Sequence, residues 1–178
     1  FKNTQALTPN GGCLPLSFTL DTTCAITRSV RDALRLHEIL AARSVRLDQR
    51  PLRALRLALP VGDMLDGLDT TVARAFDRVL VLLRAAGADI VELSLPSGES
   101  PALASGQIGA AEAWAWHRER LATRHAHYDP RVLLRIRGGE HISAADYIAR
   151  LHARRRWISQ MDTLARGVDA FICPTVPI

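Results

Sequence analysis

The stretch LRLALP at 55–60 and the stretch AGADIVELSLP at 86–96 enclose the part of the chain that decides the fold. In the first stretch leucines occupy alternate positions up to Pro60, which is the two-residue period of a β-strand. The second stretch holds another short apolar strand pattern, preceded by Gly87 as a helix stop. Between the two strands the apolar residues recur at helical spacing and share one face: Val72, Phe76, Val79, Leu83 and Ala86. Strand, helix and strand in this order predict a βαβ unit with parallel strands.

The rest of the chain alternates irregular and helical stretches. Residues 1–26 are rich in Pro, Gly, Thr and Asn and lack a helical period, so we expect irregular chain with short extended pieces. Apolar residues at three- and four-residue steps predict helices over 27–41, 101–127 and 143–166. A short apolar strand is expected at 168–173, before two prolines.

Several residues mark where these helices begin and end. Thr27 or Ser29 can cap the first helix, and Ser143 with Asp146 forms a capping box for the last one. The pair Asp129-Pro130 separates the middle helix from the next stretch, and the pair Gly138-Gly139 indicates a turn. The helix boundaries are therefore predicted from local chemistry as well as from hydrophobic period.

The charge of the chain invites a nucleic-acid interpretation that the residue pattern does not favour. Net charge is +5 and the calculated pI is about 9.8. The arginines lie along helical stretches beside Asp and Glu, and aromatic residues make up 5% of the chain, which is too few for a base-stacking platform. Nucleic acid is therefore kept as a minor alternative only. No apolar run is long enough to cross a bilayer, so we expect no membrane segment.

Three cysteines, Cys13, Cys24 and Cys173, are an odd number without CxxC spacing. This pattern argues against a disulfide framework and fits the reducing cytoplasm, where we expect the protein to reside. A catalytic cysteine stays open on spacing alone, although a small buried or half-buried thiol is the commoner case.

Metal and anion sites are not predicted. His125 and His127 form an HxH pair after His117, but two residues apart on a helix point to opposite sides. The run Arg154–Arg156 covers different faces of its helix, which favours a solvated face over an anion site. The chain has no GxGxxG motif, and its glycine pairs read as turns.

A nucleophile cannot be assigned from the residues either. The chain contains no GxSxG motif and no Gly-Ser-rich loop. Each candidate serine has a sufficient interpretation as a helix cap or turn residue: Ser17, Ser29, Ser105 and Ser143. The residues alone predict an α/β globular protein whose activity they do not assign.

A family resemblance adds to this. The stretches PLSFTLDT at 15–22 and ITRSVRDA at 26–33 are similar to a block of the amidase-signature enzymes, roughly PLxxSLDxxGPxxRSVxDAA. FKNT at 1–4 resembles the family's GLKPT, and Glu112 with His117 resembles its "E…h" helix. Further resemblances follow in the family's order: LRLALP, AGADIVELSLP, YDPRV, RIRGG, ISAADYI and VDAFICPTVPI.

The resemblance implies an α/β fold with a mixed sheet flanked by helices on both faces. It implies that residues 1–178 are the C-terminal portion of a single amidase-signature domain, with the catalytic portion before Phe1. Family members hydrolyse carboxamides through a Ser–cis-Ser–Lys triad and an acyl-enzyme. No triad residue can be placed in this chain, since its one lysine, Lys2, aligns with the KPT lysine rather than the catalytic one. No cofactor and no metal are implied.

Two residues take roles from the resemblance. In the family the aspartate at Asp21 pairs with an arginine just after the nucleophile and holds that loop, whereas a turn aspartate capping its own backbone is the local alternative. Arg28 aligns with the arginine of the RSV motif, for which a structural role is expected. The pair Cys24-Ala25 replaces the usual Gly-Pro, which would strain the backbone if position 24 needed positive φ.

These observations predict part of an amidase-type hydrolase acting on a carboxamide or acyl-urea-like C–N bond, inactive as this chain alone. One alternative is the glutamine-hydrolysing subunit of a tRNA-dependent amidotransferase, and another is a non-catalytic remnant or interaction module. The partners implied are a small-molecule amide substrate and the N-terminal segment of the same protein. A homodimer stays open as a further alternative.

Overall fold

The computed structural model describes residues 1–47, 49–62, 64–96 and 101–178, with the backbone alone at 101 and 102. Its contacts divide the chain into two compact units. One unit comprises the described residues within Phe1–Leu47 and Glu99–Arg154, and the other those within Asp48–Gly98 and Arg155–Ile178. The loop expected between the first strand and the following helix includes residue 63, which lies outside the described residues.

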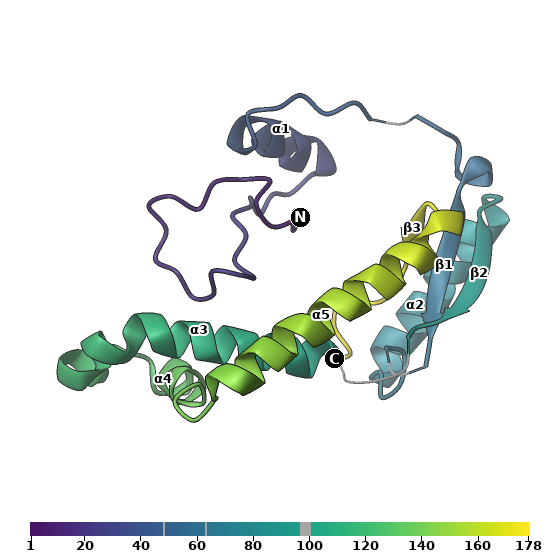
Figure 1. Cartoon of the computed structure of the whole chain (residues 1–178). Coiled ribbons are helices and arrows are strands. Elements are labelled where there is room, and N and C mark those ends of the chain that lie inside the picture. Colours follow the sequence, from purple (N-terminus) through teal and green to yellow (C-terminus); the bar gives the residue numbers. More distant parts are fainter. Residues whose placement is uncertain (48, 63, 97–100) are drawn as a thin grey trace. The chain divides into compact units, whose positions relative to one another are not determined.

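The second unit is built on a three-stranded sheet in the order β2-β1-β3 (Figure 1). Strand β1 is Arg56–Val61, β2 is Asp89–Ser94 and β3 is Ala170–Phe171. Both pairings are parallel, with Leu57 opposite Ile90 on one side and opposite Ala170 on the other. The predicted α/β class and parallel βαβ unit are confirmed, while β3 is much shorter than the expected 168–173.

The central strand β1 is covered on both faces. Four consecutive residues, Leu57 to Pro60, are buried, and successive residues of a strand point to opposite faces. Pro60 does not end the strand as expected. The carbonyls of Arg56 and Ala58 accept hydrogen bonds from residues beside β3. Every second residue of a strand directs its backbone groups to the same side, so the backbone nitrogen of Pro60 also faces the β3 side, at a point beyond the end of β3. A proline is tolerated there because no strand hydrogen bond is lost.

Helix α2, Thr70–Ala85, joins β1 to β2. The Asp69 side chain caps it by accepting from Thr71 N–H at 2.7 Å, and Gly87 ends the turn after it with φ +91°. The buried member of the helix is Leu80, whereas Val79, which the sequence placed on the inner face, is 46% exposed. Val72, Phe76 and Leu83 of the predicted inner face are half-buried, so the helix and most of its inner face are confirmed, and Val79 is the member of that face within the helix that is exposed.

The first unit consists of helices and a long irregular segment. Helix α1 is Val30–Leu40, α3 is Pro101–Arg124, α4 is Pro130–Arg137 and α5 is Ala144–Leu164, whose later residues belong to the second unit. The described residues of the two units also form short 3-10 turns: η1 Leu52–Ala54, η2 His125–His127 and η3 Ala165–Gly167.

The helix starts confirm the local chemistry expected from the sequence. Ser29 caps α1 by accepting from the Asp32 N–H, and Ser143 accepts from the Asp146 N–H at 3.0 Å at the start of α5. Helix α4 was not predicted. Asp129 caps it and Pro130 is its first residue, so this pair starts a helix as well as ending the preceding one.

Gly139 lies against helix α3. A Cβ added to Gly139 would lie 2.0 Å from the carbonyl oxygen of Ala110, so any side chain would clash with the α3 backbone. Helices α3 and α4 then enclose a small core of Ala113, Leu121 and Ile136. The glycine allows this close packing, because it has no Cβ.

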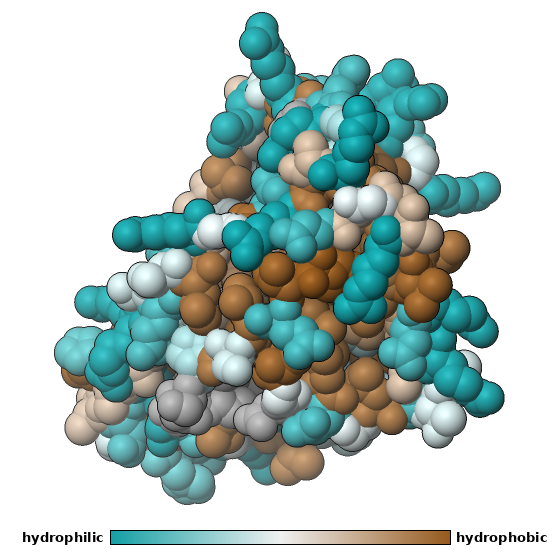
Figure 2. Space-filling view, turned by 90° about the vertical axis from the view of Figure 1, so that its right-hand side faces the viewer, coloured by the Kyte–Doolittle hydropathy of each residue, from teal (hydrophilic) through white to brown (hydrophobic). Residues whose placement is uncertain are grey.

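Many large hydrophobic side chains are open to solvent. None of the residues of α1, all of which the structure describes, is buried, and Val30 is 82% exposed. On the face drawn in Figure 2, hydrophobic side chains lie between hydrophilic ones over a wide area. Within the described residues no helix combines the length and apolarity that a bilayer crossing demands.

Candidate functional site

The first 29 residues form an irregular segment without helix or strand, called here the N-terminal loop. Its backbone forms no helix or strand hydrogen-bond pattern, and buried polar side chains form hydrogen bonds within it instead. Asn3 Nδ2 donates to Thr8 Oγ1 at 2.8 Å and to the Thr23 carbonyl at 3.2 Å, and Thr8 Oγ1 donates to the same carbonyl at 2.7 Å. These bonds tie the start of the loop to its end.

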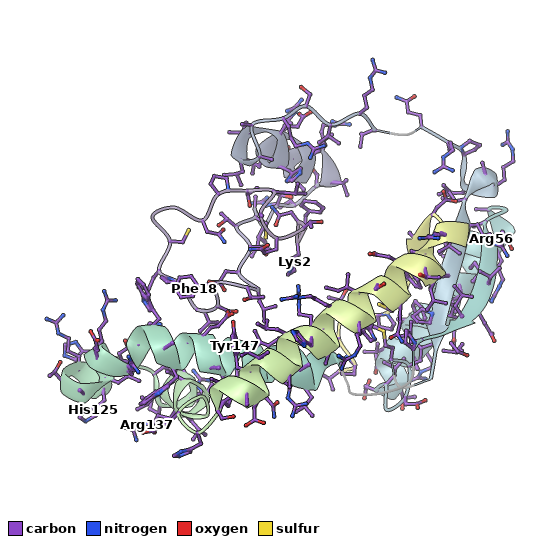
Figure 3. All side chains as sticks on the ribbon, viewed as in Figure 1. Lys2, Phe18, Arg56, His125, Arg137 and Tyr147 are labelled. Atoms are coloured by element: carbon purple, nitrogen blue, oxygen red, sulfur yellow. The ribbon has the colours of Figure 1, made fainter. Side chains whose placement is uncertain are left out.

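The carboxylate of Glu112 fixes the middle of the loop to helix α3. Ser17 Oγ and Thr19 N–H donate to Glu112 Oε2, the latter at 3.0 Å. Thr19 Oγ1 and Tyr147 Oη donate to Glu112 Oε1, the tyrosine at 2.6 Å. Figure 3 labels Tyr147 near the start of α5. One carboxylate therefore joins the loop, α3 and α5, and the residue is only 7% exposed.

These donors set the ionisation of the cluster. Burial by itself raises the pKa of the Glu112 carboxyl, but the hydrogen bonds from Ser17, Thr19 and Tyr147 together outweigh it and hold the pKa below the ordinary value. The hydrogen bond to Glu112, aided by burial, raises the pKa of the Tyr147 hydroxyl. Near neutral pH the cluster holds an ionised carboxylate and a neutral phenol, which is the arrangement that strengthens each hydrogen bond.

His117 holds a second point of the loop. The buried ring lies with Nε2 3.3 Å from the Pro15 carbonyl and Nδ1 2.8 Å from Tyr128 Oη. Because a carbonyl can only accept, Nε2 carries a hydrogen, and in the neutral ring Nδ1 accepts from the tyrosine. Glu112 and His117 thus both position the loop from α3.

Asp21 closes a turn within the loop. Its Oδ2 accepts from the Leu16 N–H at 2.9 Å and from the Ser17 N–H at 3.0 Å, and its own N–H donates to the Ser17 carbonyl. Asn10 Nδ2 donates to the Asp21 carbonyl at 3.1 Å. The local alternative, an aspartate that caps its own turn, therefore describes these contacts. Among the described residues Oδ1 accepts no hydrogen bond.

A hollow of about 920 Å³ lies between the N-terminal loop and α3. It falls within the size range of small-molecule sites. Apolar side chains of the loop and one α3 residue line it: Leu14, Pro15, Leu16, Phe18, Ile26 and Trp116. Polar and thiol groups complete the lining: Asn10, Cys13, Asp21, Thr22, Thr23 and Cys24. Phe18, labelled in Figure 3, meets the Trp116 ring edge-on at 5.7 Å between centroids.

Comparison with known proteins decides the family. A family model described as Amidase matches residues 1–178, the whole chain. The chain belongs to the amidase family. The 2-amino-5-chloromuconic acid deaminase of Comamonas testosteroni is 30% identical over 181 residues, covering 99% of this chain and 39% of that protein.

Two further relatives extend this picture. A glutamyl-tRNA(Gln) amidotransferase subunit of Ruegeria sp. (strain TM1040) is 25% identical, over 99% of this chain and 44% of that protein. A crystal structure of an amidase superposes with a TM-score of 0.91 at 31% identity, over 99% of this chain and 40% of that one. The chain spans about two fifths of the length of these amidase-family relatives.

The four serines considered in the sequence of this amidase-family chain differ in their structural roles. Ser29 and Ser143 are helix caps as expected. Ser17 is more than a turn residue, since its hydroxyl bonds Glu112, 95 residues away. Ser105 is neither cap nor turn and lies inside α3. The sequence named Glu112 only through the family resemblance, and no local pattern indicates its partners.

The remaining candidate residues lie apart from the Glu112 cluster. Cys13 and Cys24 are exposed thiols in the lining of the hollow, and Cys173 is exposed in the second unit. Among the residues that the structure describes, the non-glycine residues with positive φ are Ala6 and Ala42, so the backbone at Cys24 carries no such strain. His125 and His127 lie exposed in η2, and the described residues contain no group of three or more His, Cys, Asp or Glu able to hold a metal ion.

Lys2 and Arg28 complete the set. Lys2 is exposed in the N-terminal loop, and Arg28 is exposed just before the Ser29 cap of α1. The run Arg154–Arg156 lies on α5, spread over its faces as expected. The structure thus brings together Ser17, Asp21 and Glu112, with His117 close by on α3, as one positioning system.

Proposed function

We propose that residues 1–178 are the part of an amidase-type hydrolase that forms one wall of its active site. The whole enzyme would hydrolyse a carboxamide or acyl-urea-like C–N bond. The observation that carries this proposal is the Glu112 carboxylate, which fixes the loop at Ser17 and Thr19 beside a hollow of small-molecule size. A loop without regular structure needs such anchors before it can present a wall with constant geometry.

The family resemblance supplies the chemistry of the proposal. A serine hydroxyl attacks the carbonyl carbon, its proton passes through a bridging serine and lysine to the leaving nitrogen, and ammonia or an amine departs. Water then releases the acid from the acyl-serine. Residues 1–178 match about two fifths of the length of their amidase-family relatives. We propose that the Ser–cis-Ser–Lys triad lies in the part of the enzyme that corresponds to the remaining length. The chain alone is then inactive.

Asp21 connects the two parts in this proposal. Its Oδ2 is engaged by the Leu16 and Ser17 N–H groups, which leaves Oδ1 to receive the arginine that follows the nucleophile in the family pattern. One carboxylate then has two roles: its Oδ2 closes the turn in the loop, and its Oδ1 pairs with that arginine. Both roles hold the nucleophile loop against this wall.

Complementation tests the proposal. Residues 1–178 replace the matched part of the Comamonas testosteroni deaminase, and ammonia release from that enzyme's substrate and from a panel of carboxamides is compared with release by the chain alone. We expect release by the chimera and none by the chain alone. A folded chimera without activity would favour the non-catalytic interaction module. Release by the chain alone that stops when one of its serines is replaced would contradict the inactivity of this part.

Glutamine hydrolysis is the second candidate function. It is favoured by the similarity to a glutamyl-tRNA(Gln) amidotransferase subunit over 99% of this chain. Glutamine in the same panel separates the two candidates. Release from glutamine well above release from every other amide would assign the chimera to the glutamine-hydrolysing class.

A further inference from the structure

We propose that the hollow between the N-terminal loop and α3 is a binding subsite for a flat aromatic ring. This assignment rests on the proposed function, and it makes aromatic carboxamides the substrate class of the enzyme. The proposal begins with the chemistry of the lining. Leu14, Leu16 and Phe18 are each more than half exposed, and Ile26 is almost fully exposed, so the hollow offers apolar surface that a ligand can cover.

Phe18 and Trp116 give the hollow its preference for a ring. Their rings stand at 75° to one another with centroids 5.7 Å apart. Phe18 is 57% and Trp116 41% exposed, so both rings keep open surface. A flat ring that stacks on one of them meets the edge of the other, and both are favourable aromatic geometries. A branched aliphatic group can fill the same volume but makes neither contact.

Helix α3 carries one of the two rings and, through Glu112, holds the loop segment that carries the other. Phe18 lies between Ser17 and Thr19, both of which bond Glu112. Trp116 follows Glu112 by four residues on α3, which places the two on the same side of the helix. The carboxylate therefore holds the Phe18 segment of the loop against the helix that carries Trp116, and the ligand need not order this segment when it binds.

Charge at the hollow favours an uncharged ligand. Asp21 is the one charged side chain in its described lining. Two backbone N–H groups engage its Oδ2, and the proposed function pairs its Oδ1 with an arginine, so no unpaired charge is left for the ligand. Arg120 lies one turn beyond Trp116, with its guanidinium carbon 6.0 Å from the indole centre, so a cation already occupies the neighbourhood of that ring. A neutral ring-bearing amide suits this setting better than an ammonium group.

Direct binding to the chain of residues 1–178 tests the proposal without any turnover. The probe is 4-fluorobenzamide, followed by fluorine NMR, with benzamide, cyclohexanecarboxamide and acetamide as competitors. We expect cyclohexanecarboxamide to displace the probe at least about fivefold more weakly than unlabelled benzamide, and acetamide to displace it hardly at all.

Substitutions in the lining of the hollow test whether the probe binds there. Phe18→Ala and Trp116→Ala should each weaken probe binding about tenfold, and Phe18→Leu by less, because it keeps apolar volume without the ring. Leu134→Ala is the matched control, since Leu134 is 74% exposed and does not line the hollow. Circular dichroism checks that each variant is folded.

Several results would overturn the proposal. They are the absence of probe binding at millimolar concentration, equal displacement by cyclohexanecarboxamide, and unchanged binding in both Phe18 variants. Absence of binding together with protection of Phe18 and Trp116 from solvent in the chimera would assign the hollow to a covering polypeptide instead. An inactive chimera would contradict the proposed function but not the measured binding of the probe. An active chimera without preference for aromatic amides would contradict the aromatic substrate class but not the proposed function.

Discussion

Replacing Glu112 by glutamine is the sharpest perturbation that the structure offers. The carboxylate accepts four hydrogen bonds, from Ser17 Oγ, Thr19 N–H, Thr19 Oγ1 and Tyr147 Oη. Glutamine keeps the shape and one acceptor oxygen, which can serve Ser17 and the Thr19 N–H. Its amide nitrogen then faces two hydroxyls that must rotate to accept. The variant therefore keeps most contacts and loses the charge that strengthens them.

The size of the effect depends on the type of bond. Hydrogen bonds to a charged group contribute about 1.5–3 kcal/mol each, roughly twice as much as neutral ones. Removing the charge from four bonds that share one acceptor is not additive, and removing a buried charge returns part of the loss. Residual solvent contact screens the remainder. We expect Glu112→Gln to lower the free energy of unfolding by about 2 kcal/mol and Glu112→Ala by about 4 kcal/mol.

Urea unfolding of residues 1–178, followed by tryptophan fluorescence, measures this loss. Trp114 and Trp116 lie on α3 beside Glu112 and report on the unit concerned. Glu119→Gln is the matched control, because Glu119 is an exposed glutamate on the same helix and its loss should change stability by less than about 0.5 kcal/mol. Amide hydrogen exchange at Thr19 gives a local readout, which should rise in the Glu112 variant alone. A Glu112→Gln protein as stable as the Glu119→Gln control, with Thr19 still protected, would refute this reasoning.

The effect depends on pH with a definite sign. Because the folded pKa of Glu112 lies below the ordinary value of 4.5, the ionised carboxylate stabilises the fold above that value. This stabilisation is lost as the pH falls through the folded pKa. The difference in unfolding free energy between the wild type and Glu112→Gln should be constant near neutrality and shrink below about pH 4.5. A difference that grows on acidification would contradict this assignment.

Three further predictions rest on other residues. Gly139→Ala should destabilise the chain by about 1–3 kcal/mol in urea unfolding, since its Cβ would overlap the Ala110 carbonyl, whereas Gly106→Ala, with open space around it among the described residues, should be neutral or stabilising. Ala6→Gly should stabilise the chain by about 0.5 kcal/mol in the same assay by relieving φ +68°, and a loss of stability would contradict that strain. Asp21→Asn in the chimera should lower kcat/KM about tenfold while its pH–rate profile keeps its acidic limb, and a lost limb would mark Asp21 as titrating in catalysis.

The local elements of the fold could be predicted from the sequence because their causes are local. The leucine alternation at 55–60 and the glycine at position 87 specify β1 and the end of α2 without knowledge of distant residues. Capping at Ser29 and Ser143 is a contact across three residues. Pro60 was misjudged as a strand end, since the tolerance of a proline depends on which neighbour its nitrogen faces.

The candidate site was much less predictable, because its contacts join distant parts of the chain. Ser17 and Thr19 reach Glu112 across 95 and 93 residues, and Tyr147 reaches it across 35. Nothing in the period of α3 distinguishes an inward glutamate from a solvated one. The family resemblance named Glu112 and His117 as a pair, and the geometry then showed that both bond the N-terminal loop.

The chemistry of the N-terminal loop explains why one anchor matters so much. In most folded segments the polar groups face solvent and the apolar side chains are buried. Here the Asn3 and Thr8 side chains are buried and donate to the Thr23 carbonyl of the loop backbone, while Phe18 and Ile26 remain exposed. Such a loop gains little from burying its own apolar surface, so its position depends on external bonds. Loss of Glu112 should therefore weaken ligand binding in the hollow more than it weakens the helical core around Ile136. Measuring probe affinity and core amide exchange in the same Glu112→Gln protein separates the two, and equal loss of both would show that the loop is simply part of the core.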